Sequence, residues 1–447
     1  MTSIAPERHG PSRDAARAVI FHPVWSRDRA NGTAPDARLA EAVGLGRAID
    51  LVIADQALVP VRRSRAATLF GTGTVADLGR RIAAARAELA IVDAALAPIQ
   101  QRNLEKAWHC KVIDRTGLIL EIFGARARTR EGRLQVSLAA LSYQRSRLVR
   151  SWTHLERQRG GHGFLGGPGE SQLESDRRQL DQKITRLRRQ LDGVVRTRAL
   201  HRAARRRIPY PVVALVGYTN AGKSTLFNRL TGAGVNAEDK LFATLDPTMR
   251  GLVLPSGRTV ILSDTVGFIS DLPTELVAAF RATLEEVVAA DMIVHIRDIS
   301  QADHAARKAS VEAILDDLGI DGAGDQGSMI EVFNKIDLVD RSAAAAMPVN
   351  GWAHPGPIAV SAMTGEGCGR MLRMIDDRLT AGRPIVGLRI GLDDGAALAW
   401  LYRHGEVLER ADDDRFACLR VGLDDADQAR FRRRFPSHGG DGGIFLE

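Results

Sequence analysis

Apolar and polar positions follow changing periods along this 447-residue chain. From residue 18 to about residue 130, short apolar runs (AVIF, LVIA, LAIVDA, CKVID) alternate with helical periodicity, as at 74–89 and 98–108. Strands that alternate with helices indicate a parallel sheet covered by helices. The pattern predicts an N-terminal α/β subdomain at 18–132, preceded by a disordered tail at 1–17.

Two long amphipathic helices are predicted next, because apolar residues recur at spacings of three, four or seven. Between them, residues 160–170 (GGHGFLGGPGE) contain six glycines and one proline, which cannot continue either helix. We therefore expect a helical hairpin at 133–207 with a Gly-rich tip. The apolar positions are Leu134, Leu138, Leu141, Leu148, Trp152 and Leu155, then Leu173, Leu180, Ile184, Leu187, Leu191 and Val194.

Strand and helix patterns alternate again from the apolar run at 212–216 to about residue 379. This alternation predicts a doubly wound sheet in a domain at 208–382. The remainder, 383–447, has short strand patterns (IVGLRIGL, FACLRVGL) around a helical one (AALAWLYRH). It predicts a small α+β C-terminal domain.

Composition narrows the class of protein. The sequence has no run of about 18 apolar residues and no signal-peptide core at its start, so we expect a cytoplasmic protein without a membrane span. Cys110, Cys368 and Cys418 lie far apart and form no CxxC pair. This spacing argues against a disulfide framework and against a zinc site.

Positive charge is concentrated in the predicted hairpin. Residues 141–207 carry 17 Lys and Arg against 6 Asp and Glu, whereas the whole chain has a net charge of +8. A charge run is usually a solvated helix face, but on a basic hairpin it favours a nucleic-acid partner. The tip is either a plain turn or, as we favour from its length, a binding element. Residues 161–166 also match the dinucleotide fingerprint GxGxxG, but no strand precedes them.

The strongest motif is GYTNAGKS at 217–224, which follows an apolar strand and opens a helix. This is the P-loop pattern in the context that it requires. Backbone N–H groups of such a loop surround phosphates, Lys223 reaches the β- and γ-phosphates, and Ser224 binds Mg²⁺. The motif predicts a nucleoside triphosphate site.

Two further segments complete the predicted phosphate and magnesium site. DTVG at 264–267 ends a strand pattern, so that Asp264 can hold Mg²⁺ and the Gly267 N–H can meet the γ-phosphate. Between it and the P-loop lies DKLFATLDPT, in which Thr244 is the favoured second magnesium ligand and Thr248 the alternative.

The base is predicted to be guanine. NKID at 334–337 follows an apolar strand, and the Asp337 carboxylate can accept hydrogen bonds from both N1–H and N2–H₂ of guanine, a pair that adenine lacks. After the next strand pattern, Ser361 and Ala362 lie where a backbone N–H could contact guanine O6.

Phe268 follows DTVG, where many small GTPases have a glutamine that orients the attacking water. A phenyl ring cannot polarise water. We therefore hypothesise slow intrinsic turnover that depends on groups supplied from elsewhere in the chain or by a partner.

The sequence resembles the HflX-type GTPases, a ribosome-associated branch of the P-loop GTPases. The resemblance rests on LFGTGTV, PIQQRNLE, GGHGFLGGPGESQLESDRR, VGYTNAGKSTLFN, DKLFATLDPT, DTVGFI and NKID, which together span about residues 69–380. It implies an N-terminal α/β subdomain joined to a helical hairpin, then the GTPase domain. It also implies ribosome-stimulated GTP hydrolysis, binding to the large ribosomal subunit or whole ribosome with the hairpin tip near ribosomal RNA, and in some members ribosome splitting or rescue under stress.

The family's nucleotide positions carry over to this sequence, with catalytic roles for Lys223, Thr244 and Gly267 and magnesium roles for Ser224, Thr244 and Asp264. The full set of implied nucleotide-binding residues is Gly217, Tyr218, Thr219, Asn220, Ala221, Gly222, Lys223, Ser224, Phe242, Ala243, Thr244, Leu245, Asp246, Asp264, Thr265, Val266, Gly267, Asn334, Lys335, Ile336, Asp337, Ser361, Ala362 and Met363.

Three functional hypotheses remain open from the sequence. The favoured one is a monomeric, Mg²⁺-dependent GTPase that acts on the ribosome. A GTP-switched RNA- or protein-binding module or chaperone acting off the ribosome is the second. The third, an enzyme that modifies RNA or a metabolite, lacks a Cys/His cluster, a nucleophile–base pattern or a carboxylate pair in the sequence.

Overall fold

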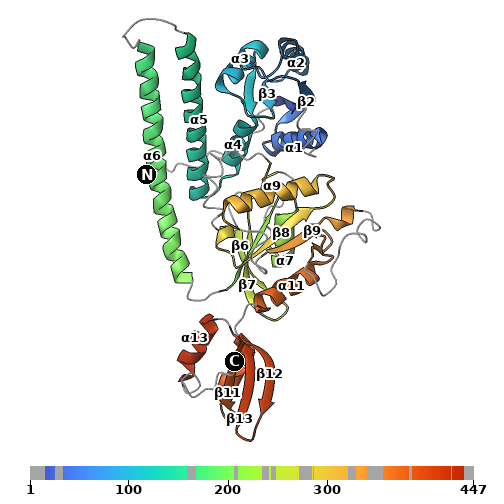
Figure 1. Cartoon of the computed structure of the whole chain (residues 1–447), viewed down its shortest axis with the longest axis vertical. Coiled ribbons are helices and arrows are strands. Elements are labelled where there is room, and N and C mark those ends of the chain that lie inside the picture. The colour runs from blue at the N-terminus through green and yellow to red at the C-terminus, as the bar shows by residue number, and fades with distance from the viewer. Residues whose placement is uncertain are drawn as a thin grey trace, which may run out of the picture.

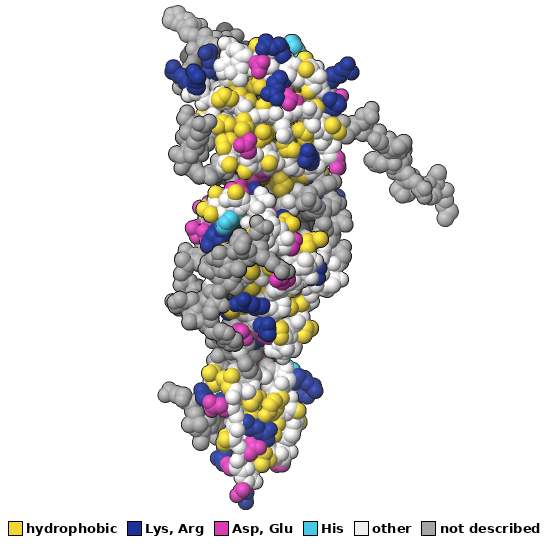
Figure 2. All heavy atoms as spheres, turned by 90° about the vertical axis from the view of Figure 1, so that its right-hand side faces the viewer, with side chains coloured by type: hydrophobic (Ala, Val, Ile, Leu, Met, Phe, Trp, Pro, Cys, Tyr) yellow, Lys and Arg dark blue, Asp and Glu magenta, His cyan; other side chains and the backbone are white. Residues whose placement is uncertain are grey.

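The computed structural model describes residues 16–25, 34–158, 168–205, 210–233, 241–242, 248–270, 284, 286–320, 329–339, 356–381, 385–423 and 425–436. Its parts follow one another along a long axis (Figures 1 and 2). The N-terminal domain and a helical hairpin lie at one end, the GTPase-type domain in the middle and a small domain at the other end. This arrangement confirms the predicted α/β fold class.

The N-terminal domain is built on a parallel sheet of four strands in the order β2-β1-β3-β4. Apolar side chains of α2 and α3 pack on one face, and those of α1 and α4 pack on the other. The elements are β1 (Arg17–Trp25), α1 (Pro35–Ala48), β2 (Val52–Val61), α2 (Thr72–Ala85), β3 (Leu89–Val92), α3 (Pro98–Trp108), β4 (Lys111–Asp114) and α4 (Arg115–Arg126).

Two local features of this domain differ from the sequence pattern. The helix predicted at 74–89 ends at Ala85, because Arg86 adopts a left-handed conformation and Leu89 already begins β3. Helix α4 was not predicted as a separate element. Most of its residues are buried, so it lacks the polar face from which an amphipathic helix is recognised.

The predicted hairpin consists of α5 (Arg130–Gln158) and α6 (Pro168–Arg205), which lie side by side (Figure 1). Helix α6 begins at Pro168, inside the stretch that we expected to lie outside both helices. Proline is accepted in a first helical turn because the N–H that it lacks has no partner in the helix. The rest of the Gly-rich tip lies outside the described residues.

The central domain has a six-stranded sheet in the order β10-β9-β8-β5-β7-β6, parallel except for the β6–β7 pair. Helices α7 and α11 pack on one face, and α9 packs on the other. The elements are β5 (Val212–Gly217), α7 (Lys223–Thr231), β6 (Thr248–Val253), β7 (Thr259–Asp264), β8 (Met292–Asp298), α9 (His304–Asp317), β9 (Met329–Asn334), the 3₁₀ turn η2 (Ile336–Leu338), β10 (Ile358–Ala359) and α11 (Cys368–Ala381).

The C-terminal domain is an antiparallel sheet in the order β11-β13-β12, with the apolar side chains of two helices packed against it. This matches the α+β expectation. Its elements are β11 (Ile385–Gly391), α12 (Gly395–His404), β12 (Glu406–Asp412), β13 (Phe416–Gly422) and α13 (Asp425–Arg434).

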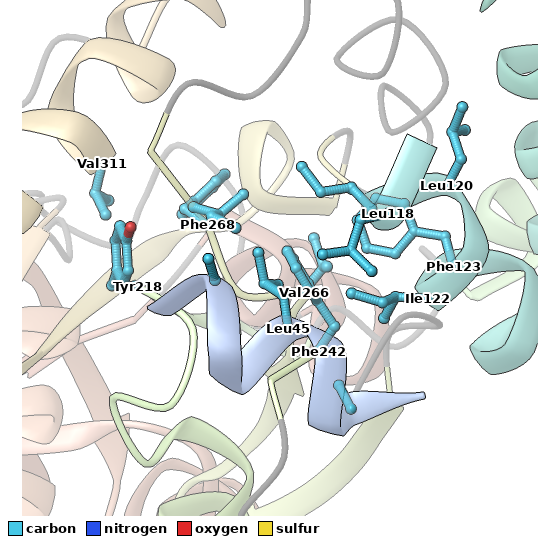
Figure 3. Packing of buried hydrophobic residues seen from close by; sticks show 14 of the residues in the cluster. Leu45, Leu118, Leu120, Ile122, Phe123, Tyr218, Phe242, Val266, Phe268 and Val311 are labelled. Atoms are coloured by element: carbon cyan, nitrogen blue, oxygen red, sulfur yellow. The ribbon is translucent and has the colours of Figure 1, made fainter. Parts of the chain in front are cut away.

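The N-terminal and central domains share one hydrophobic core. Helices α1 and α4 contribute Leu45, Leu118 and Phe123, which join Phe242 and Phe268 of the central domain in a single buried cluster (Figure 3). The rings of Phe123 and Phe242 pack edge to face with centroids 4.7 Å apart. Burial of large apolar side chains on both sides fixes the relative position of the two domains.

None of the helices within the described residues is long and apolar enough to cross a membrane.

Candidate nucleotide and magnesium site

The P-loop connects the buried strand β5 to helix α7. Gly217 has a φ of +151°, and a Cβ atom there would lie 2.2 Å from the carbonyl oxygen of Ile296. Gly222 has a φ of +91°, and its Cβ would lie 2.2 Å from Nδ2 of Asn334. Both positions therefore require glycine, which lets the backbone wrap closely at the start of α7.

Lys223 lies inside this loop, with only 6% of its surface exposed. Its Nζ donates hydrogen bonds to the carbonyl oxygens of Gly217, at 3.1 Å, and Tyr218, at 2.8 Å. The ammonium group is thus held within the loop by two neutral acceptors. A phosphate would be a stronger partner for it.

The predicted magnesium ligands Ser224 and Asp264 are brought together from the start of α7 and the end of β7. The Ser224 hydroxyl donates to Oδ2 of Asp264 at 2.7 Å, and Asp264 is fully buried. Hydroxyl and carboxylate oxygens are the hard donors that Mg²⁺ prefers, so this pair fits the ion. The favoured third ligand, Thr244, lies outside the described residues, and its alternative Thr248 begins β6 opposite Asp264 in the β6–β7 register.

The segment after Asp264 lies against the P-loop. A Cβ on Gly267 would lie 2.8 Å from Cα of Thr219 and 3.1 Å from Nζ of Lys223. Backbone hydrogen bonds fix this approach, because Thr219 N donates to Phe268 O at 2.7 Å and Phe268 N donates to Gly217 O at 3.1 Å. Only a glycine permits this approach, because any Cβ atom would overlap the Thr219 backbone. Thr265 is buried and donates its hydroxyl to Leu215 O, while Val266 joins the shared core.

Asn334 links the two halves of the predicted base site. Its Nδ2 donates to Ala221 O at 2.8 Å, and its Oδ1 accepts from Ala362 N at 3.0 Å. Asn334 therefore ties the P-loop to the loop after β10. The Asp337 carboxylate at η2 is exposed, as an acceptor for an incoming base must be.

The other predicted base-site residues surround Asn334. Lys335 has a φ of +66° and pairs with Asp298 at 2.8 Å, and Ile336 begins η2. Ser361 is buried, whereas 68% of the surface of Met363 is exposed.

Arg229 of α7 was missed by the sequence analysis. Its Nε donates to Ala362 O at 2.5 Å, and it also donates to Met363 O, so it holds the loop that follows β10. It belongs to no sequence motif, and an arginine in the second turn of the helix after a P-loop cannot be told from any other polar helix residue by its sequence position.

Among the predicted site residues, Asn220 has a φ of +59° in the loop and Phe242 lies in the shared core. Ala243, Leu245 and Asp246 lie outside the described residues, as does Thr244. Within the part of the chain that the structure describes, no cluster of His, Cys, Asp or Glu side chains forms a separate metal site.

Comparison with known proteins identifies the family of this chain. Four family models match successive parts of the chain: "GTP-binding GTPase N-terminal" at 36–124, "GTP-binding GTPase Middle Region" at 126–205, "50S ribosome-binding GTPase" at 212–335 and "HflX C-terminal domain" at 350–440. The GTPase HflX of Magnetococcus marinus is 50% identical over 387 residues, which is 86% of this chain and 88% of that protein. The chain belongs to the HflX family of GTPases.

Similar proteins are also found in other organisms. The Escherichia coli GTPase HflX is 40% identical over 82% of this chain and 85% of its own length. The human putative GTP-binding protein 6 is 36% identical over 94% of this chain and 81% of its own length. A solved GTP-binding protein of Sulfolobus solfataricus with GDP is 20% identical, with a TM-score of 0.44 over 82% of this chain and 99% of its own. Family membership makes this protein a GTP-hydrolysing enzyme.

Burial changes the protonation of the P-loop lysine in this HflX-family enzyme. It lowers the pKa of Lys223 to about 8, although the nearby Asp264 acts in the opposite direction. The pKa of an unperturbed lysine is 10.5, so between about pH 8 and 10.5 the unfolded chain binds more protons than the folded one. The contribution of Lys223 to the free energy of unfolding therefore rises with pH across this window.

Nucleotide binding should show the opposite pH dependence. Phosphates favour the charged form of Lys223, so binding above about pH 8 requires proton uptake. We expect the affinity for GDP to be constant near pH 7 and to fall above pH 8 by up to about 10-fold per unit. Titration of a fluorescent GDP derivative from about pH 7 to 9 measures this. Lys223→Arg keeps its charge throughout and should remove the dependence; an unchanged slope in Lys223→Arg would assign it to another group.

Proposed function

We propose that this GTPase uses Mg²⁺ and associates with the large ribosomal subunit in the cytoplasm through its helical hairpin. GTP and Mg²⁺ would order the segments around Thr244 and Asp264, and hydrolysis would release them. Ser224 and Asp264 would hold the ion, which supplies charge stabilisation at the β- and γ-phosphates. Ribosome splitting or rescue under stress is the cellular role that the family resemblance favours.

The observation that carries this proposal is the surface of α6. Its 38 residues correspond to a rod of roughly 57 Å. Among the side chains that the structure describes over residues 174–196, seven cationic ones are exposed against two acidic ones, Glu174 and Asp192. Asp181 is half-buried and pairs with Arg145 at 3.0 Å. A long rod with excess positive charge fits the phosphates of folded RNA. The exposed cations are Arg177, Arg178, Lys183, Arg186, Arg188, Arg189 and Arg196.

The root of the hairpin is firmly attached to the N-terminal domain. On α5, Tyr143 donates its hydroxyl to Oδ1 of Asp114 at 2.6 Å, and Arg147 pairs with Asp114 at 3.1 Å and donates to Leu96 O at 2.8 Å. Asp114 also caps α4. These contacts fix the base of the hairpin to the domain that packs on the GTPase core. The match of 212–335 to a model described as a "50S ribosome-binding GTPase" supports the same partner.

Steady-state GTP hydrolysis with and without large ribosomal subunits tests the proposal. We expect strong stimulation by subunits, and Arg186→Glu/Arg189→Glu on α6 should weaken subunit binding by about 10-fold or more while basal hydrolysis stays unchanged. The matched control, Arg403→Glu/Arg433→Glu, reverses two exposed charges of α12 and α13 and should leave stimulation intact.

Absence of stimulation, with GTP-dependent binding to free RNA or to another protein, would favour the alternative of a GTP-switched module that acts off the ribosome. Equal loss of stimulation in both double variants would show a general charge effect instead of a hairpin site.

A further inference from the structure

A buried polar network crosses from the N-terminal domain to the P-loop. Arg115, the first residue of α4, donates from Nη1 to Oδ1 of Asp93 at 2.7 Å and from Nη2 to Glu41 of α1. The same Nη2 also donates to the carbonyl oxygen of Ser270 in the GTPase domain at 3.1 Å. The side chains of Arg115, Glu41 and Asp93 are 6%, 7% and 2% exposed.

Tyr218 meets this network from the other side of the boundary. Its hydroxyl donates to Glu41 and accepts from Ser270 N at 2.9 Å, with Ser270 Oγ 2.7 Å away. Burial, and then the negative charge of Glu41, raise the pKa of Tyr218 far above its usual value, so the hydroxyl remains a donor. Arg307 of α9 lies over the ring at 5.1 Å from its centroid. The second residue of the P-loop motif is thus held by the N-terminal domain.

Such a network has a defined geometry. Buried charges are costly unless each finds its partners, and in a low dielectric the hydrogen bonds between them are strong. The buried Glu41 carboxylate has its hydrogen-bond partners only when Arg115 and Tyr218 both donate to it. The N-terminal domain therefore fixes Tyr218 and Ser270 in one arrangement.

Tyr218 and Ser270 lie close in sequence to residues at the predicted position of the γ-phosphate. Tyr218 is next to Thr219, which is hydrogen-bonded to Phe268 O, and Ser270 lies three residues after Gly267. Gly267 itself approaches Lys223. The N-terminal domain also contacts Leu241, which lies shortly before Thr244 in the chain: a Cβ atom on Gly44 of α1 would lie 3.0 Å from Cδ1 of Leu241.

We propose that Glu41 and Arg115 are positioning residues for GTP: through Tyr218 and Ser270 they hold Gly267 against the P-loop, where its N–H meets the γ-phosphate. GDP has no γ-phosphate and gains nothing from this arrangement. The N-terminal domain thereby raises the affinity of the site for GTP relative to GDP. The inference rests on the nucleotide site and does not require the ribosome.

Binding of GDP and of a non-hydrolysable β,γ-imido analogue of GTP to the full-length protein tests it. Glu41→Gln and Tyr218→Phe keep the shape of the side chain and weaken or remove the bond between them. We expect each to lower the affinity for the GTP analogue about 5- to 10-fold while the affinity for GDP changes less than about twofold. Since both act on one bond, the double variant should lose little more than either single variant.

The matched control is Asp55→Asn, which removes an ion pair with Arg81 (2.7 Å) in the same domain but away from the boundary. It should leave both affinities unchanged. A purely structural role would weaken GDP and GTP-analogue binding equally in Glu41→Gln and Tyr218→Phe, and that result, like no loss at all, would overturn the proposal.

A second measurement needs no variant and stays informative if a substituted protein fails to fold. If the domain contact favours GTP, then the GTP analogue must strengthen the contact by the same factor. Hydrogen exchange of the α1 backbone in the wild-type protein should therefore be slower with the GTP analogue than with GDP, both at saturation. Equal exchange rates in the two states would contradict the inference.

Discussion

GTP hydrolysis by the Lys223→Ala variant is expected to fall by about 10²- to 10³-fold in kcat. Lys223 is the buried cation of the P-loop, and its Nζ lies only 3.1 Å from where a Cβ atom on Gly267 would be, beside the predicted position of the γ-phosphate. Its removal takes away the charge that meets the phosphates as negative charge develops on them. Steady-state phosphate release at saturating GTP measures the effect.

The control for this experiment is Lys183→Ala, which removes an exposed lysine of α6 and should leave hydrolysis without ribosomes unchanged. Circular dichroism should show that Lys223→Ala is folded, since the substitution removes a charge whose burial is costly. A folded Lys223→Ala protein with wild-type turnover would mean that the P-loop is not the site of hydrolysis.

The Asp337→Asn variant is expected to lose GTP binding by about 10²- to 10³-fold and to gain affinity for xanthosine triphosphate. The exposed Asp337 carboxylate is predicted to accept two hydrogen bonds from guanine, and a bond to a charged group contributes about 1.5–3 kcal/mol. An asparagine offers one acceptor and one donor, which matches the N–H and carbonyl of xanthine. Competition of both triphosphates against a fluorescent GDP derivative measures the change.

Asp337→Ala provides the contrast, because it removes the acceptors without providing a donor. Its affinity for GTP should fall by as much as that of Asp337→Asn, and its affinity for xanthosine triphosphate should not rise. Equal affinity of Asp337→Asn and the wild-type protein for GTP would place the guanine contact elsewhere.

The sequence was sufficient to predict those features of the protein that depend on a local pattern of residues. Gly217 and Gly222 can be recognised from the sequence because the close approach of their backbones leaves no space for a Cβ atom. The P-loop motif therefore has glycine at both positions. The helical hairpin could be predicted because the apolar positions of α5 and α6 keep a helical period over many turns. The order of strands and helices then indicated the fold class without knowledge of any contact.

The sequence was insufficient where a side chain serves two domains. From the sequence, Phe268 is notable only because it stands where many small GTPases have a glutamine, yet the residue is 3% exposed and packs in the core shared with α1 and α4. The motif indicates that Tyr218 is a nucleotide-binding position, and the structure adds that its hydroxyl binds Glu41, 177 residues earlier in the chain. No periodicity links residues so far apart, so these roles emerge only from the three-dimensional packing.

The shared core also sets the order in which the protein can be completed during synthesis. Phe123 leaves the ribosome roughly 120 residues before its partner Phe242. At a synthesis rate of about 5–20 residues per second, the apolar face of α1 and α4 stays uncovered for on the order of 10 s before the central domain can pack on it. A nascent chain that stops before the P-loop strand would therefore present this face uncovered, and its N-terminal domain would depend on chaperones or aggregate.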